Sequence, residues 1–224
     1  MRVLQGILVF LCFVFVPASS RLAHASENPY FPLVPGLYSP YTAGDTIDIF
    51  YNVIGTEEFY GHTVWVVMRG VVWSGRHILE IYSTDTDGDV LYHGRRSVDT
   101  AGVLIDQVFN PPIRIIDMPV LVGKSWVDNT VVSRYQDGIL FETEEGLTYS
   151  GRIVAIDIPI DVPAGSFSTL EIAGDWGSGA TRYWFAQDIG TVRLERPGGG
   201  TESLAGPVVA IEQLSWGSVK SLYR

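Results

Sequence analysis

The stretch YWFAQDIGTVRLE, Tyr183–Glu195, decides the fold expected of this chain. Two runs rich in aromatic and β-branched residues flank Gln187–Gly190, where the glycine supplies the positive φ that tight connections between strands often need. In the second run Val192 and Leu194 alternate with charged residues, which predicts one face on a core and the other in water. We therefore expect an antiparallel hairpin here.

The same pattern extends along the rest of the chain. Short segments rich in glycine, aspartate and proline separate apolar or alternating runs, and no helical period follows the first residues. We expect one strand to end at Asn110–Pro112 and a turn to separate two others at Glu144–Gly146. Three prolines in residues 29–35 exclude a helix and predict an extended segment along a sheet edge. Strands are expected at residues 47–54, 62–73, 77–83, 89–95, 103–109, 130–135, 139–143, 147–158, 166–173 and 208–216, besides the hairpin.

These strands predict one all-β domain over residues 26–224. A twisted sheet of about a dozen strands must curl or split. We expect a single curved antiparallel sheet, a half-barrel or open barrel, with a β-sandwich as the alternative. Runs such as Val64–Met68, apolar on both faces, are compatible with either architecture.

The first 25 residues have the pattern of a signal peptide. Arg2 precedes the apolar run Ile7–Val16, and Ala23–Ala25 has the small-x-small form of a cleavage site. That run is shorter than the roughly 18 residues that a spanning helix needs. The only cysteine, Cys12, lies inside the run, so no lipid anchor is expected. We predict an exported, periplasmic or extracellular chain without a transmembrane helix after processing.

Charge and composition argue against nucleic-acid partners. The chain has 15 lysines and arginines against 25 aspartates and glutamates, a net charge of −10. No basic cluster of the kind that binds nucleic acid or anionic lipid is visible. The acidic balance favours solubility and says little else about function.

One polar cluster resembles part of a metal site. Asp85, Asp87 and Asp89 alternate around Gly88, as at the start of a calcium loop. The distal glutamate and flanking helices of that loop are missing, so an acidic turn is the favoured interpretation and a metal site a weak alternative. The histidines of the processed chain lack the spacing of a metal pair on one element. We expect no metal and no cofactor.

Aromatic residues supply the candidate binding site. Tryptophans most often fill a core, but on a curved sheet they can also line a groove that holds an apolar ligand. The candidate ligand contacts are Trp65, Trp126, Tyr183, Trp184 and Phe185.

Three segments together resemble a known group of proteins. They are YFPL (Tyr30–Leu33), DVPAGSFSTLE (Asp161–Glu171) and the hairpin Tyr183–Glu195, in that order. The chain is similar here to the TapB-like group of exported bacterial proteins of unknown function. The usual Gly-x-x-Trp-x-Tyr after the opening motif is GLYSPY (Gly36–Tyr41), so the first strand is expected to begin later. The resemblance implies a curved sheet similar to the lipoprotein-carrier half-barrels of the bacterial envelope, with no catalytic residues to carry over.

The favoured hypothesis is a non-enzymatic envelope protein. It would hold a lipid, another apolar or amphipathic ligand, or a protein partner on the concave face of its sheet. One alternative is an envelope hydrolase acting on glycan or ester substrates, and another is a structural or pilus-associated subunit with an exposed apolar edge. The hydrolase would require some members of one polar set to converge in a cleft. That set is Asp85, Asp87, His77, His93, Glu142 and Glu171.

Overall fold

The computed structural model describes residues 28–43, 47–71, 76–98 and 103–210. The expected signal peptide, residues 1–25, lies outside this range, as does most of the last expected strand. The strands, in chain order, are β1 (Leu37–Thr42), β2 (Ile47–Phe59), β3 (His62–Val71), β4 (Arg76–Thr84), β5 (Val90–Val98), β6 (Leu104–Ile116), β7 (Ser125–Gln136), β8 (Ile139–Val162), β9 (Gly165–Asp175), β10 (Ala180–Ala186), β11 (Gly190–Glu195), β12 (Thr201–Leu204) and β13 (Val209–Ala210).

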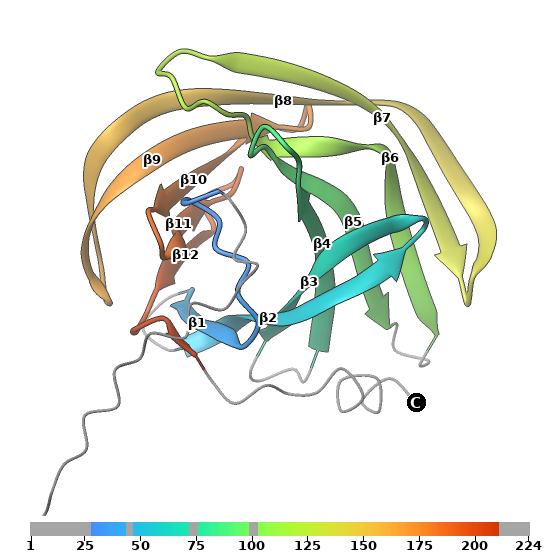
Figure 1. The fold of residues 1–224 in the computed structure, drawn as a ribbon, viewed down its shortest axis with the longest axis horizontal. Coiled ribbons are helices and arrows are strands. Elements are labelled where there is room, and N and C mark those ends of the chain that lie inside the picture. Colours follow the sequence, from blue (N-terminus) through green and yellow to red (C-terminus); the bar gives the residue numbers. More distant parts are fainter. Residues whose placement is uncertain (1–27, 44–46, 72–75, 99–102, 211–224) are drawn as a thin grey trace, which may run out of the picture.

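Each strand from β1 to β12 pairs antiparallel with the next in sequence, and the sheet then closes on itself (Figure 1). Closure comes from β1, which pairs with β12 through Tyr41↔Leu204 and Thr42↔Ser203. The short β13 pairs with the first residues of β1. The prediction of an all-β domain built from one curved antiparallel sheet of about a dozen strands is confirmed, and the sheet forms a closed barrel.

The aromatic hairpin forms as expected, but two predicted breaks are wrong. β6 runs through Asn110–Pro112, because these residues lie between two stretches of its pairing with β5 and need donate no ladder hydrogen bond there. The predicted turn at Glu144–Gly146 is part of continuous β8. Gly146 has a φ of 74°, and the register of the β7–β8 pair shifts nearby. Gly146 therefore lies in a β-bulge and not in a turn.

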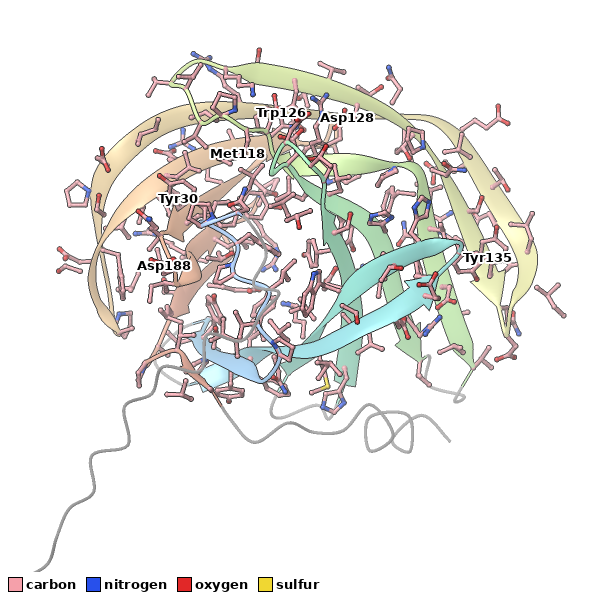
Figure 2. All side chains as sticks on the ribbon, in the orientation of Figure 1. Tyr30, Met118, Trp126, Asp128, Tyr135 and Asp188 are labelled. Carbon is pink, nitrogen blue, oxygen red and sulfur yellow. The ribbon has the colours of Figure 1, made fainter. Side chains whose placement is uncertain are left out.

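Both faces of the sheet around β2–β4 are buried. On β3, Val67 and Arg69 point into the barrel, whereas Val66 and Met68 point to the other face. On that other face, the tip of the β2–β3 hairpin meets β6 and β7. Tyr60 at this tip packs on Tyr135 of β7 with ring centroids 4.6 Å apart. Figure 2 shows Tyr135 beside the hairpin tip. The buried side chains on the face away from the barrel interior form a hydrophobic core of their own. It is made of Ile54, Phe59, Val64, Val66, Met68, Leu79, Ile81 and Val108.

Residues 28–36, here called the N-terminal strap, cross one end of the barrel (Figure 1). Asn28 Nδ2 donates to the carbonyl of Gly88 at 2.8 Å, and the amide of Asp188 donates to the carbonyl of Pro29 at 2.7 Å. At its far end the amide of Gly36 donates to the carbonyl of Val53. The strap thus joins the β4–β5 and β10–β11 turns, which lie at one end since neighbouring strands alternate in direction. The sequence predicted an extended segment along a sheet edge. The strap instead crosses one end of the barrel.

The first half of β8 is an open strand edge. β8 pairs with β7 from Ile139 onward, whereas its pairing with β9 begins only at Ser150. Ile139, Leu140 and Phe141 are exposed, at 72%, 52% and 52% of their surface. Apolar residues on an unpaired edge are unusual, because such edges are templates for further strand pairing.

Within the described ranges, no helix has the length and apolar character needed to cross a membrane.

Candidate functional site

The barrel encloses a cavity of about 480 Å³. This size lies within the range of small-molecule binding sites. The strap supplies Phe31, Pro32 and Leu33 to its wall, and strands and strand connections from both halves of the chain supply the rest. The remaining apolar and aromatic lining is Leu37, Tyr41, Tyr51, Val53, Val67, Ile78, Tyr82, Tyr92, Ile115, Trp176, Tyr183, Phe185, Ile189 and Leu194. The other polar lining is Ser39, Arg69, Glu80, Arg95, Thr181, Thr191, Arg196 and Glu202, and Gly190 completes the wall.

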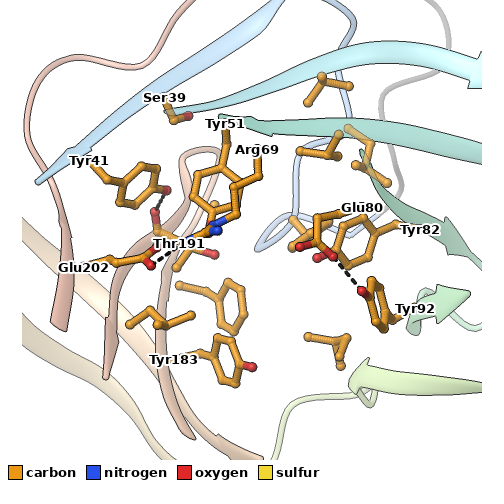
Figure 3. Close-up of a pocket in the computed structure, with 18 of the residues that line it drawn as sticks. Ser39, Tyr41, Tyr51, Arg69, Glu80, Tyr82, Tyr92, Tyr183, Thr191 and Glu202 are labelled. Carbon is orange, nitrogen blue, oxygen red and sulfur yellow. Dashed lines mark hydrogen bonds and ion pairs between the residues drawn. The ribbon is translucent and has the colours of Figure 1, made fainter. Parts of the chain in front are cut away.

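Glu202 is the centre of a polar network in this cavity (Figure 3). Arg69 Nη2 donates to Glu202 Oε1 at 2.8 Å, and Arg196 Nη1 donates to the same oxygen. The Tyr51 hydroxyl donates to Glu202 Oε2 at 3.1 Å and accepts from Arg69 Nε at 3.0 Å. Burial opposes ionisation of Glu202, but the hydrogen bonds and charges of the two arginines outweigh it and lower the pKa of this carboxyl. Glu202 is therefore a buried, ionised group.

Glu80 lies across the cavity in a different environment. The Tyr92 hydroxyl donates to Glu80 Oε2 at 2.6 Å (Figure 3). No ion pair joins Glu80 to an arginine within the described ranges. Burial raises the pKa of Glu80, and the Tyr92 hydrogen bond and nearby arginines only partly offset this effect. Its partial exposure is to the cavity, so its carboxyl oxygens can meet an enclosed molecule.

Several tyrosines add hydroxyl groups to the wall. Burial is the largest cause that raises the pKa of Tyr51, Tyr82, Tyr92 and Tyr183. Each hydroxyl therefore keeps its proton at neutral pH and can donate or accept a hydrogen bond. The wall combines these groups with broad apolar surfaces.

The two ends of the cavity differ in polarity. Phe31, Leu33 and Phe185 lie at the strap end, where Phe31 packs on Tyr82 with ring centroids 4.9 Å apart. Arg196 follows β11, and therefore lies at the opposite end of the barrel. Its side chain is 42% exposed, and it binds Glu202 at the beginning of β12. The cavity is thus apolar at one end and charged at the other.

A second cavity, of about 220 Å³, lies around two histidines. The rings of His62 and His93 are 5.0 Å apart, and Ser83 Oγ lies 2.8 Å from His93 Nε2. Within the described residues no carboxylate bonds to His93, so a Ser–His–carboxylate arrangement is incomplete. Burial, with a smaller contribution from His62, lowers the pKa of His93 to about 4.

We expect this histidine to make the fold acid-sensitive. Its folded pKa lies below the ordinary value of 6.5, so its contribution to stability is present above pH 6.5 and is lost as the pH falls toward 4. The full loss is about 3 kcal/mol, since each pKa unit is worth about 1.4 kcal/mol. Urea unfolding of the wild type and of His93→Gln at pH 7.5, 6.0, 5.0 and 4.0 would measure it. A difference between the two proteins that does not change with pH would contradict the prediction.

The structure separates the predicted aromatic contacts into two groups. Tyr183 and Phe185 line the large cavity, with their rings stacked 5.9 Å apart. Trp65, Trp126 and Trp184 are absent from its lining. Trp126 is buried and donates from Nε1 to the carbonyl of Arg114, while the Trp184 ring lies under the guanidinium of Arg193. Trp65 packs beside Val53 and Val67.

The predicted polar residues are dispersed. Asp85 Oδ1 accepts hydrogen bonds from the amides of Asp87 and Asp89 within the turn. Asp89 Oδ1 accepts a hydrogen bond from the amide of Met118. In the part of the chain that the structure describes, no group of three or more His, Cys, Asp or Glu side chains is placed to hold a metal ion.

The remaining members of the hydrolase set lie apart. Glu171 on β9 pairs with Arg182. Glu142, on the exposed half of β8, pairs with Arg134 on β7. His77 packs against Phe50, and only His93 lines a cavity.

The polar network could not be predicted from the sequence. Arg69 and Glu202 are 133 residues apart, so no local motif joins them. One signal was available in β3, where Arg69 takes an inward position in the run Val64–Val71 that is otherwise almost wholly apolar. A charged residue at such a position indicates either a buried ion pair or a binding site.

No family model, curated protein or solved structure matches this chain.

Proposed function

We propose that this chain is an exported, non-enzymatic binding protein that holds a small amphipathic molecule inside its barrel. The observation that supports this most is the cavity of about 480 Å³, with its apolar strap end and charged opposite end. Its described lining offers hydrogen-bonding groups, an ion-pair network and aromatic surfaces, which suit retention of a ligand. The resemblance to TapB-like envelope proteins stays a prediction from three segments.

A neutral fluorescent probe tests the proposal without assuming a headgroup. We expect N-phenyl-1-naphthylamine to bind the wild type with enhanced emission. Ile78→Trp places a large side chain in the cavity and is expected to weaken binding at least tenfold. Val127→Trp is the control, because Val127 is 60% exposed on β7 and is absent from the cavity lining. Equal binding by all three proteins, or none by the wild type, would contradict the proposal.

The open edge of β8 favours a second candidate, a structural subunit that assembles through strand pairing. The apolar residues Ile139–Phe141 would stabilise such a pairing. If this candidate is right, sedimentation of the wild type depends on concentration, Phe141→Lys abolishes that dependence, and Val122→Lys on the β6–β7 connection does not. A monomer at all concentrations up to the millimolar range would exclude self-assembly through this edge.

A further inference from the structure

The charged end of the cavity has more positive charge than its own carboxylate neutralises. Arg69 and Arg196 both bind Glu202, and both bind the same oxygen of it. Two guanidinium groups and one carboxylate leave a surplus of one positive charge in a partly buried place. Arg95 also lines the cavity and makes no ion pair within the described ranges. This surplus contrasts with the net charge of −10 of the whole chain.

Glu80 does not remove the surplus, because Arg95 also lines the cavity. With both carboxylates ionised, three guanidinium groups, those of Arg69, Arg95 and Arg196, face only Glu80 and Glu202. An unpaired charge in a low-dielectric place is costly, so a cavity of this kind favours an enclosed anion.

The two arginines also keep donors for such an anion. Arg69 uses Nε for Tyr51 and Nη2 for Glu202, and Arg196 uses Nη1 for Glu202. Arg69 Nη1 and Arg196 Nη2 have no hydrogen-bond acceptor among the described residues. A guanidinium has five N–H groups in a planar fork, which suits a carboxylate.

We propose that the ligand is an organic acid with an apolar body, whose carboxylate binds Arg69 and Arg196 and whose body extends toward the strap. This rests on the proposed function and adds the headgroup and the orientation. The carboxylate takes the free N–H groups beside Glu202, and the body contacts Val67, Phe185 and Leu33. The charge at one end and the aromatic wall at the other thus select both parts of the molecule.

Three matched probes with the same ten-carbon chain test the headgroup: decanoate, 1-decanol and decyltrimethylammonium. The two charged probes are used below their micelle concentrations and 1-decanol below its solubility limit. Displacement of N-phenyl-1-naphthylamine at pH 7.5 gives their affinities. We expect decanoate to bind at least tenfold more tightly than 1-decanol, because charge-assisted hydrogen bonds are about twice as strong as neutral ones. Decyltrimethylammonium is expected to bind most weakly.

Variants then locate the headgroup. Arg196→Met is expected to lower the affinity for decanoate about tenfold and to change the affinity for 1-decanol less than twofold. Arg69→Lys keeps a positive charge at the more buried position. Its affinity for decanoate is expected to lie between those of Arg196→Met and the wild type. Arg134→Met is the control, because Arg134 pairs with exposed glutamates on β8 and is absent from the lining.

The outcomes separate this inference from the proposed function. Equal affinity for decanoate and 1-decanol, or an unchanged decanoate affinity in Arg196→Met, would overturn the anionic ligand and leave the binding cavity standing. Failure of the wild type to take up any of the probes, including the naphthylamine, would overturn both.

Discussion

Glu202→Ala is expected to destabilise the protein by about 3–5 kcal/mol, the cost typical of removing one partner from a buried ion pair. Glu202 is 2% exposed, and it accepts hydrogen bonds from Arg69, Arg196 and Tyr51. Arg196 can turn toward solvent, since its side chain is 42% exposed. Arg69, only 17% exposed, cannot do so, and its charge would stay in the cavity without its main partner.

An exposed ion pair provides the control for this prediction. Glu144 pairs with Arg134 at 3.1 Å, but its side chain is 48% exposed. Glu144→Ala is expected to change stability by less than about 1 kcal/mol, because solvent screens such pairs. Urea unfolding followed by tryptophan fluorescence measures both variants. Similar losses in the two would show that the Glu202 network adds no more than a surface pair.

Gly94→Ala is expected to cost more than about 4 kcal/mol, or to prevent folding. A methyl group at Gly94 would lie 1.9 Å from the carbonyl oxygen of Gln107, on the neighbouring strand β6. That oxygen belongs to the backbone and can move only if the β5–β6 pairing moves with it. Gly94 also has a φ of 138°, which side-chain-bearing residues rarely adopt.

Gly61→Ala separates the two causes. Gly61 has a φ of 87° in the β2–β3 turn, but no atom lies within 4 Å of the added methyl. It is expected to lose about 1–2 kcal/mol through the backbone alone. Thermal unfolding by circular dichroism compares the two variants. Equal losses would mean that the strands accommodate the methyl group and that the clash carries no cost.

The sequence predicts local strand chemistry better than the shape of the whole sheet. The hairpin Tyr183–Glu195 follows from residues next to one another. The sequence predicts a turn at Gly146, whereas the structure has a bulge there, because a positive φ is common to turns and bulges. Closure through Tyr41↔Leu204 joins residues far apart in the chain, and no local pattern specifies it.

The candidate site shows the same limit. Tyr183 and Phe185 line the cavity, and both lie in the hairpin that the sequence specifies. Their role in binding a ligand stays a prediction. Arg69, Glu80 and Glu202 come together only through the curvature of the sheet, which depends on the register of eleven strand pairs and on β1 meeting β12. A charge on an apolar strand is visible in the sequence, but its partner is not.

A crystal structure of the protein grown with 12-bromo-1-dodecanol tests most directly that the barrel interior is the binding site. The bromine marks the end of the apolar body by its anomalous scattering, and the neutral headgroup makes no assumption about charge. We predict an anomalous peak inside the barrel near Phe31 and Phe185, at the strap end of the cavity. A peak only on the outer surface, for example over Ile139–Phe141, or a cavity without the molecule at saturating concentration, would contradict the account.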